Sequence, residues 1–324
     1  MIDSKGRIID YLRISITDRC NLRCAYCMPK EGIIPISGKD LLSFEEIIRI
    51  CQVMAEDGLK KVKITGGEPL VRKDAVALIR EIKKIDGIEK VTLTTNGVYL
   101  ENQMKALFEA GIDGINISLD TLDEKLYAEI TGQDQMDKVM RGLREALLYP
   151  EVQLKVNCVP LGLDRQNLVE IAELAKTRKI HVRFIEMMPV GLGKKYKGVK
   201  EETVKEELEK KYPKLTSFEK SLGNGPSHYY SIEGFLGKIG FISAISHKFC
   251  NSCNRMRLTS TGYLKTCLQF DSGKDLKQMM RNGCSDEELK ALILEAVAEK
   301  PDEHLFLEKT IIHEDILCMS QIGG

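Results

Sequence analysis

The chain has 324 residues, about twice the length of a typical domain, which excludes a single small module. Hydrophobic residues make up 43% of it, an ordinary globular value that excludes a disordered or low-complexity chain. Lys and Arg number 48, as do Asp and Glu, so no cationic excess points to nucleic acid or to an anionic membrane.

The N-terminal segment carries no secretion or membrane signal. Residues 1–10 are polar, and no apolar run approaches the roughly 18 residues that a membrane-spanning helix requires. We therefore expect a cytoplasmic protein. In that reducing compartment, the ten cysteines are expected to be metal ligands or buried packing residues and not disulfides.

Strands and helices alternate through the first 190 residues. A capping box from Ser43 to Glu46 predicts the start of a helix that ends at Gly58. Strands are predicted at 12–17, 62–65, 91–94, 115–119, 152–158 and 182–186, with further helices at 73–84, 99–110, 137–148 and 167–177. Strands that alternate with helices pair in parallel through right-handed crossovers. Residues 1–190 are therefore expected to form an α/β fold, an incomplete (β/α)6 TIM-like barrel with a lateral opening.

After Pro189 the pattern changes to α+β. Residues 191–195 resemble a linker, and two hairpins are predicted at 227–243 and 256–266. Two short helices are expected within 274–300, while residues 322–324 show no folding pattern. The chain is therefore expected to divide into a barrel of residues 1–190 and a C-terminal α+β region of residues 191–324.

Three cysteines directly follow the first predicted strand. Cys20, Cys24 and Cys27 form C-x3-C-x2-C in the loop where β/α barrels carry their active sites. Three thiolates can bind three irons of a [4Fe–4S] cube and leave the fourth iron open to a small molecule. The alternative is a structural zinc site, which usually requires a fourth protein ligand, and none is near in the sequence.

The segment from Cys20 to Cys27, with an aromatic residue before its third cysteine, resembles the signature of the radical S-adenosylmethionine (SAM) superfamily. Thr-Gly-Gly-Glu-Pro at 65–69 resembles that superfamily's site for the amino group of SAM. The resemblance implies that SAM chelates the open iron and that its one-electron cleavage releases a 5′-deoxyadenosyl radical, which takes hydrogen from a substrate. It assigns SAM binding to Tyr26, Gly67, Ser118 and Met188.

Three further cysteines lie in the C-terminal region. Cys250, Cys253 and Cys267 form C-x2-C-x13-C across a predicted hairpin. By itself this set would suit zinc as well as iron and sulfide, with Cys284 or His247 as a fourth ligand. Beside the first motif, it resembles the second cluster of the GTP 3′,8-cyclases, the family that begins molybdenum-cofactor biosynthesis, where one iron stays free for substrate.

Several cations are predicted to face the barrel interior or the second cysteine set. Arg255 and Arg257 share one side of a strand, and Lys63 and Lys155 alternate with apolar residues, so these lysines should point inward and require an anion. The resemblance implies GTP ligands at Arg13, Lys63, Thr94, Lys155, Arg255, Met256 and Arg257, with Met256 acting through its backbone. Lys63 departs from the family, where arginine is expected more often; the charge remains, but a bidentate phosphate contact is lost.

The resemblance covers nearly the whole chain, from residues 10–15 to the terminal Gly323-Gly324. In this family the diglycine tail enters the active site, which implies catalytic roles for Gly323 and Gly324 beside Arg255 and Arg257. A tail without side chains can pass through a narrow pocket, whereas the alternative is a frayed terminus.

The resemblance implies a lyase with two [4Fe–4S] clusters and SAM as cofactors. It would cyclise GTP to (8S)-3′,8-cyclo-7,8-dihydroguanosine 5′-triphosphate, the first step of molybdenum-cofactor biosynthesis. Expected partners are an electron donor such as flavodoxin or ferredoxin, a cyclic pyranopterin synthase acting downstream and a second copy of the chain; no nucleic acid and no membrane is expected.

Two other functions compete with this interpretation. A radical SAM peptide maturase would also carry an auxiliary cluster, but such enzymes usually have more cysteines in this region and a peptide-binding module. A zinc-bearing nucleic-acid-binding protein would need a cationic excess, which the chain lacks. The remaining cysteines are expected to be buried packing residues: Cys51, Cys158, Cys284 and Cys318.

Overall fold

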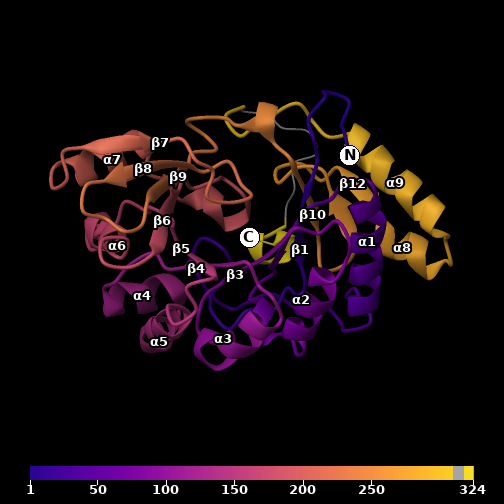
Figure 1. Ribbon diagram of the computed structural model, residues 1–324, viewed down its shortest axis with the longest axis horizontal. Helices are drawn as coiled ribbons and strands as arrows, with labels where there is room; N and C mark the ends of the chain where they lie inside the picture. The colour runs from indigo at the N-terminus through magenta and orange to yellow at the C-terminus, as the bar shows by residue number, and fades with distance from the viewer. Residues whose placement is uncertain (309–316, 324) are drawn as a thin grey trace.

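The computed structural model describes residues 1–308 and 317–323, and its strands form one curved sheet (Figure 1). The sheet has the order β12-β11-β10-β1-β2-β3-β4-β5-β6-β9-β8-β7. The strands are β1 (Tyr11–Ser15), β2 (Lys61–Thr65), β3 (Lys90–Thr95), β4 (Gly114–Ser118), β5 (Gln153–Cys158), β6 (Ile180–Ile185), β7 (Leu215–Phe218), β8 (His228–Ile232), β9 (Ile239–Ile242), β10 (Arg255–Leu258), β11 (Tyr263–Lys265) and β12 (Gly273–Asp275).

The strands β1 to β6 pair in parallel in sequence order, which confirms the six-stranded barrel. The order has two ends, β12 and β7, so the barrel is open, as expected. Strands of the C-terminal half extend it at both edges, because β10 pairs in parallel with β1 and β9 pairs in parallel with β6. The two halves of the chain therefore share one sheet, and a division at residue 190 stays a prediction.

Helices cover the outer side of this sheet, while the C-terminal end of the described chain lies inside its curve (Figure 1). The capping box is confirmed, since Ser43 Oγ accepts from Glu46 N at 3.1 Å and Glu46 Oε2 accepts from Ser43 N at 2.7 Å. The helices are α1 (Phe44–Glu56), α2 (Ala75–Lys83), α3 (Leu100–Glu109), α4 (Glu124–Thr131), α5 (Met136–Ala146), α6 (Leu168–Glu173), α7 (Glu201–Glu209), α8 (Leu276–Arg281), α9 (Asp286–Ala298) and α10 (Met319–Ile322).

The core lies between the helices and the outward-facing side chains of the strands. Leu12 and Ile14 of β1 are fully buried, as are Val62 and Ile64 of β2. The residues between them point to the other face, because successive side chains of a strand alternate. Each parallel strand therefore contributes apolar side chains to the core and polar side chains to the barrel interior.

The expected elements of the C-terminal half are confirmed: two hairpins, β8–β9 and β10–β11, and two helices, α8 and α9. Several structured segments differ from expectation. The sequence pattern missed α4, α7 and β7, which are short, and the expected linker at 191–195 is a 3-10 helix. The tail, expected to lack structure, forms the one-turn helix α10. In the part of the chain that the structure describes, no helix has the length and apolarity to cross a membrane.

Candidate active site

A cavity of about 530 Å³ lies inside the curve of the sheet. The loops after β1, β2, β3 and β4 meet at one edge of a parallel sheet, which is where β/α barrels place their sites. The cavity is lined by sixteen of the predicted site residues: Arg13, Cys20, Cys24, Tyr26, Cys27, Lys63, Gly67, Thr94, Ser118, Lys155, Met188, Cys250, Cys253, Arg255, Arg257 and Cys267.

Two described residues of the predicted site, Met256 and Gly323, are not among those that line this cavity. The side chain of Met256 is fully buried in the core, so only its backbone is available to a ligand. Gly323 lies against Ser15 and Thr65. Gly324 lies outside the described residues.

The first cysteine loop buries its thiols. Burial raises the pKa of Cys27 to about 12, with further increases from Cys20 and Cys318, and burial beside Cys27 raises the pKa of Cys24 well above its usual value. Buried thiols that repel one another as thiolates ionise only when a cation joins them. This environment fits an iron–sulfur cluster, whose irons supply that positive charge.

The loop after β2 packs directly against the first cysteine loop. A Cβ atom on Gly67 would lie 2.4 Å from the carbonyl oxygen of Arg19 and 2.7 Å from that of Asp18, so no larger residue fits. Glu68, which is fully buried, ties this loop to the end of β3. Its carboxylate accepts from Thr95 Oγ1 at 2.8 Å and from Asn96 N at 2.6 Å. Burial raises the pKa of Glu68 to about 7.

Tyr26 is oriented by a carboxylate at the end of β4. Its hydroxyl donates to Asp120 Oδ2 at 2.6 Å. Burial raises the pKa of Asp120 to about 6. The phenol is therefore fixed at the wall of the cavity, two residues along the chain from Cys24.

Cations line the opposite part of the cavity in one row of the sheet. The register pairs Arg13 of β1 with Lys63 of β2 on one side and with Arg257 of β10 on the other. Burial lowers the pKa of Lys63 and of Arg257 well below their usual values, and nearby cations lower both further. Burial also lowers the pKa of Lys155 to about 6. A bound polyanion would relieve this repulsion and favour the charged forms.

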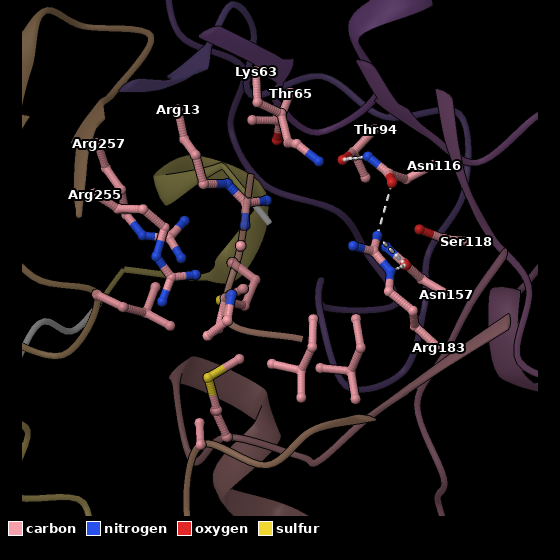
Figure 2. Close-up of a pocket in the computed structure, with 18 of the residues that line it drawn as sticks. Arg13, Lys63, Thr65, Thr94, Asn116, Ser118, Asn157, Arg183, Arg255 and Arg257 are labelled. Atoms are coloured by element: carbon pink, nitrogen blue, oxygen red, sulfur yellow. Dashed lines mark hydrogen bonds between the residues drawn. The ribbon is translucent and has the colours of Figure 1, made fainter. Parts of the chain in front are cut away.

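A polar network on the other wall was missed by the sequence analysis. Arg183 of β6 donates to Asn157 Oδ1 at 2.9 Å through Nε and to Asn116 Oδ1 at 2.7 Å through Nη2. Figure 2 shows these three side chains across the cavity from Arg13, Arg255 and Arg257. Arg183 alternates with apolar residues, so the period-two signal used for Lys63 and Lys155 could have found it.

The second cysteine set flanks the β10–β11 hairpin: Cys250 and Cys253 precede β10, and Cys267 follows β11. The backbone N–H of His304 donates to Cys250 Sγ, and burial raises the pKa of Cys250. Burial opposes ionisation of Cys253 as well, but the charges of Arg255 and Lys300 and hydrogen bonds from Arg255 lower its pKa to about 7. Cationic surroundings that stabilise thiolates suit a metal cluster.

Each cysteine set offers three thiols at the cavity wall, which is the donor chemistry of an iron–sulfur cube with one open iron. Over residues 1–308 and 317–323, no group of three His, Cys, Asp or Glu residues is placed to hold a single metal ion. The fourth ligands considered for zinc are elsewhere, since neither His247 nor Cys284 lines the cavity and His247 lies 3.4 Å from Glu202.

The C-terminal tail contacts the first cysteine set and the cation row. The backbone N–H of Ser320 donates to Cys27 Sγ, and Met319 lines the cavity. Gly323 O accepts from Arg257 Nη1 at 2.8 Å. Cys318 is half-buried beside Cys27, and Cys284 is also only half-buried, so the expected burial holds fully for Cys51 and Cys158 alone.

Two family models match consecutive parts of the chain. Residues 14–178 match the Radical SAM superfamily, and residues 180–306 match Molybdenum Cofactor Synthesis C. A protein of Clostridium perfringens (strain SM101 / Type A) named GTP 3′,8-cyclase is 48% identical over 326 residues, with all of both chains covered. A protein of the same name from Pelotomaculum thermopropionicum is 43% identical over 331 residues, again with full coverage of both.

Solved structures share the fold at low identity. Streptococcus suis SuiB bound to S-adenosylmethionine superposes with a TM-score of 0.63 at 18% identity, covering 83% of this chain and 63% of that one. The same protein bound to its precursor peptide SuiA gives a TM-score of 0.60 at 18% identity, covering 89% of this chain and 67% of that one. These likenesses concern the fold alone.

Proposed function

Because the chain belongs to the GTP 3′,8-cyclases, a family of radical SAM enzymes of molybdenum-cofactor biosynthesis, we propose that its cavity binds GTP between two iron–sulfur clusters. The product is (8S)-3′,8-cyclo-7,8-dihydroguanosine 5′-triphosphate. The two [4Fe–4S] clusters and SAM supply the one-electron chemistry that removes hydrogen from C3′ of the ribose and permits its bonding to C8 of guanine.

The segments after β1, β2, β4 and β6 would hold the first cluster and SAM. Cys20, Cys24 and Cys27 would each bind one iron, and the fourth iron would be available to the amino and carboxylate groups of SAM. Gly67 presents backbone at close range, which its lack of a side chain allows. The remaining SAM contacts are Tyr26, whose hydroxyl Asp120 orients, and Ser118 and Met188 at the cavity wall.

The cations of the cavity bind the triphosphate. Arginine forks match phosphate oxygens bidentately, whereas Lys63 and Lys155 act as point charges. Arg183, held by Asn116 and Asn157, adds a further guanidinium to the expected set. The full set is Arg13, Lys63, Lys155, Arg183, Arg255 and Arg257, with Thr94 and the backbone of Met256 as neutral contacts.

The second cysteine set would hold the cluster that positions the purine. Cys250, Cys253 and Cys267 would each bind one iron, and the remaining iron would be available to the guanine edge. Arg255 lies two residues after Cys253, and Arg257 pairs with Arg13 in the cation row, so phosphate and base would be held by neighbouring residues. Gly323 closes this region, since its carbonyl already accepts from Arg257. The catalytic role predicted for Gly324 falls on a residue outside the described part of the chain. A closed cavity keeps water from reactive intermediates.

The observation that carries this proposal is the position of two three-cysteine sets and a row of buried cations on one cavity. The test is the substitution of Cys250, Cys253 or Cys267 by Ala in anaerobically reconstituted enzyme. We expect SAM cleavage to continue at the first cluster while the cyclised nucleotide disappears. Unchanged product formation would contradict the role of the second set.

The cellular setting completes the proposal. An electron donor such as flavodoxin or ferredoxin would reduce the clusters, a cyclic pyranopterin synthase would take the product, and a second copy of the chain would form a homodimer. The cytoplasm suits a chain whose ten cysteines, all within the described residues, form no disulfide. The boundary between the barrel of residues 1–190 and the C-terminal region of residues 191–324 belongs to this proposal as well.

A further inference from the structure

The segment after α9 places one buried lysine between two of the second-set cysteines. Lys300 is only 4% exposed and lines the cavity. Its Nζ donates to Arg255 O at 2.9 Å and to Thr266 O at 2.6 Å. Arg255 lies two residues after Cys253, and Thr266 directly precedes Cys267. A single ammonium therefore joins the two backbone segments that carry these cysteines.

The same segment is fixed to the third cysteine by Arg7 of the N-terminal hairpin. Arg7 Nη1 donates to Cys250 O and to Asp302 O, both at 3.0 Å, and Nη2 donates to Pro301 O at 2.8 Å. The guanidinium is itself held by the buried carboxylate of Asp3 at 2.6 Å. Lys300 thus has a fixed backbone as well as fixed acceptors, and its side chain has little freedom to move away.

The ammonium of Lys300 lies beside the backbone that leads to two of the cysteines, since its acceptors belong to Arg255 and Thr266. Burial lowers the pKa of Lys300, whereas the thiolate charges of Cys253 and Cys267 raise it. Reduction adds a negative charge to a thiolate-ligated cluster, and a positive charge held nearby in a low dielectric favours the reduced form. Two neutral carbonyl acceptors do not cancel the charge, in contrast to Lys290 of α9, which pairs with the carboxylate of Asp57 at 2.9 Å.

We infer that Lys300 is a positioning residue of the second cluster, which holds the Cys253 and Cys267 segments together and raises the reduction potential of the cluster they bind. The inference rests on the proposed second cluster. The segment that follows α9 thereby gains a role in the second cluster that the cysteine spacing does not reveal.

The test isolates the second cluster in a parent variant, C20A/C24A/C27A, that lacks the first. The parent and three further variants, K300M, K300Q and K300R, are reconstituted with iron and sulfide without oxygen. Midpoint potentials come from redox titration followed by electron paramagnetic resonance, and iron loss is timed in a chelator. K290M, which removes an exposed lysine of α9, is the matched control.

We expect K300M and K300Q to shift the midpoint potential to more negative values and to lose iron faster, while K300R and K290M remain at the parent values. K300Q keeps an amide donor without the charge, so it carries the test if K300M folds poorly. If K300Q has the midpoint potential of the parent, the inference about Lys300 is overturned, whereas the proposal of a second cluster is unaffected. A parent that binds no iron overturns the second cluster itself and this inference with it.

Discussion

The guanidinium of Arg257 donates a hydrogen bond to the carbonyl oxygen of Gly323 at 2.8 Å. This contact joins the end of the described chain to the cation row of Arg257, Arg13 and Lys63. The tail therefore lies against the cations that are proposed to bind GTP, and its Ser320 contacts Cys27 of the first cysteine set. Its conformation should matter for turnover more than for stability.

Substitution of Gly323 tests the tail. Gly323 has φ of +89°, and a Cβ atom there would lie 2.9 Å from Ser15 Cβ. A positive φ costs a residue with a side chain about 1–2 kcal/mol. This cost lowers the fraction of molecules whose tail is docked by roughly 5- to 30-fold. We expect G323A to lower the rate of GTP cyclisation by about that factor, measured as product per minute.

The matched control for the tail is G283A. Gly283 has φ of +86°, but no atom lies within 4 Å of the Cβ position. It carries the same backbone strain far from the cavity, so cyclisation should be unchanged. Equal rates for G323A and the parent would show that the docked tail plays no part in turnover.

Substitution of Gly67 tests the SAM site. A Cβ atom 2.4 Å from Arg19 O forces the loop after β2 away from the first cysteine loop. A misplacement of about 1 Å can cost a reaction roughly 100-fold. We expect G67A to lower SAM cleavage by about that factor, measured as 5′-deoxyadenosine, while the second cluster retains its iron. G38A, with open space around its Cβ position, should cleave SAM normally.

The ionisation of Lys155 predicts how GTP binding depends on pH. Burial lowers its pKa to about 6, so at neutral pH the free enzyme holds a largely neutral amine. A bound triphosphate raises that pKa, so binding takes up a proton. Affinity for GTP should therefore fall as the pH rises above about 6, by up to tenfold per unit for one proton.

The control for this pH dependence is K155R, whose guanidinium stays charged throughout the range. Titration calorimetry in buffers of different ionisation enthalpy counts the protons directly. The parent should take up more protons than K155R between pH 6 and 8. Protons taken up by the nucleotide itself are the same for both proteins, so the difference belongs to Lys155. Identical proton uptake would show that Lys155 is charged before GTP arrives.

Substitution of Arg183 tests the wall opposite Arg13. Lysine keeps the charge but cannot reach both Asn116 and Asn157 as the guanidinium does. A charge-assisted hydrogen bond is worth about 1.5–3 kcal/mol, so R183K should weaken GTP binding by roughly 10- to 100-fold. Equilibrium dialysis with GTP measures this loss. R165K, at an exposed surface pair with Glu129, should bind GTP as the parent does.

Much of the site follows from local sequence alone. The spacing of Cys20, Cys24 and Cys27 suits three corners of a cube, and the alternation around Lys63 and Lys155 predicts which face of each strand they occupy. The capping box at Ser43 and Glu46 marks the start of α1. These features depend on residues within a few positions of one another, which is why periodicity and spacing reveal them.

Only the tertiary structure shows which distant segments become neighbours. Arg257 lies beside Arg13 because β10 pairs in parallel with β1, across more than 240 positions of the chain. The contacts of Lys300 with Arg255 and Thr266 have the same origin, as do those of Arg183 with Asn116. A side-chain pattern identifies the face of a strand, but the neighbour of that strand depends on how the whole sheet minimises exposed apolar surface and unpaired backbone groups.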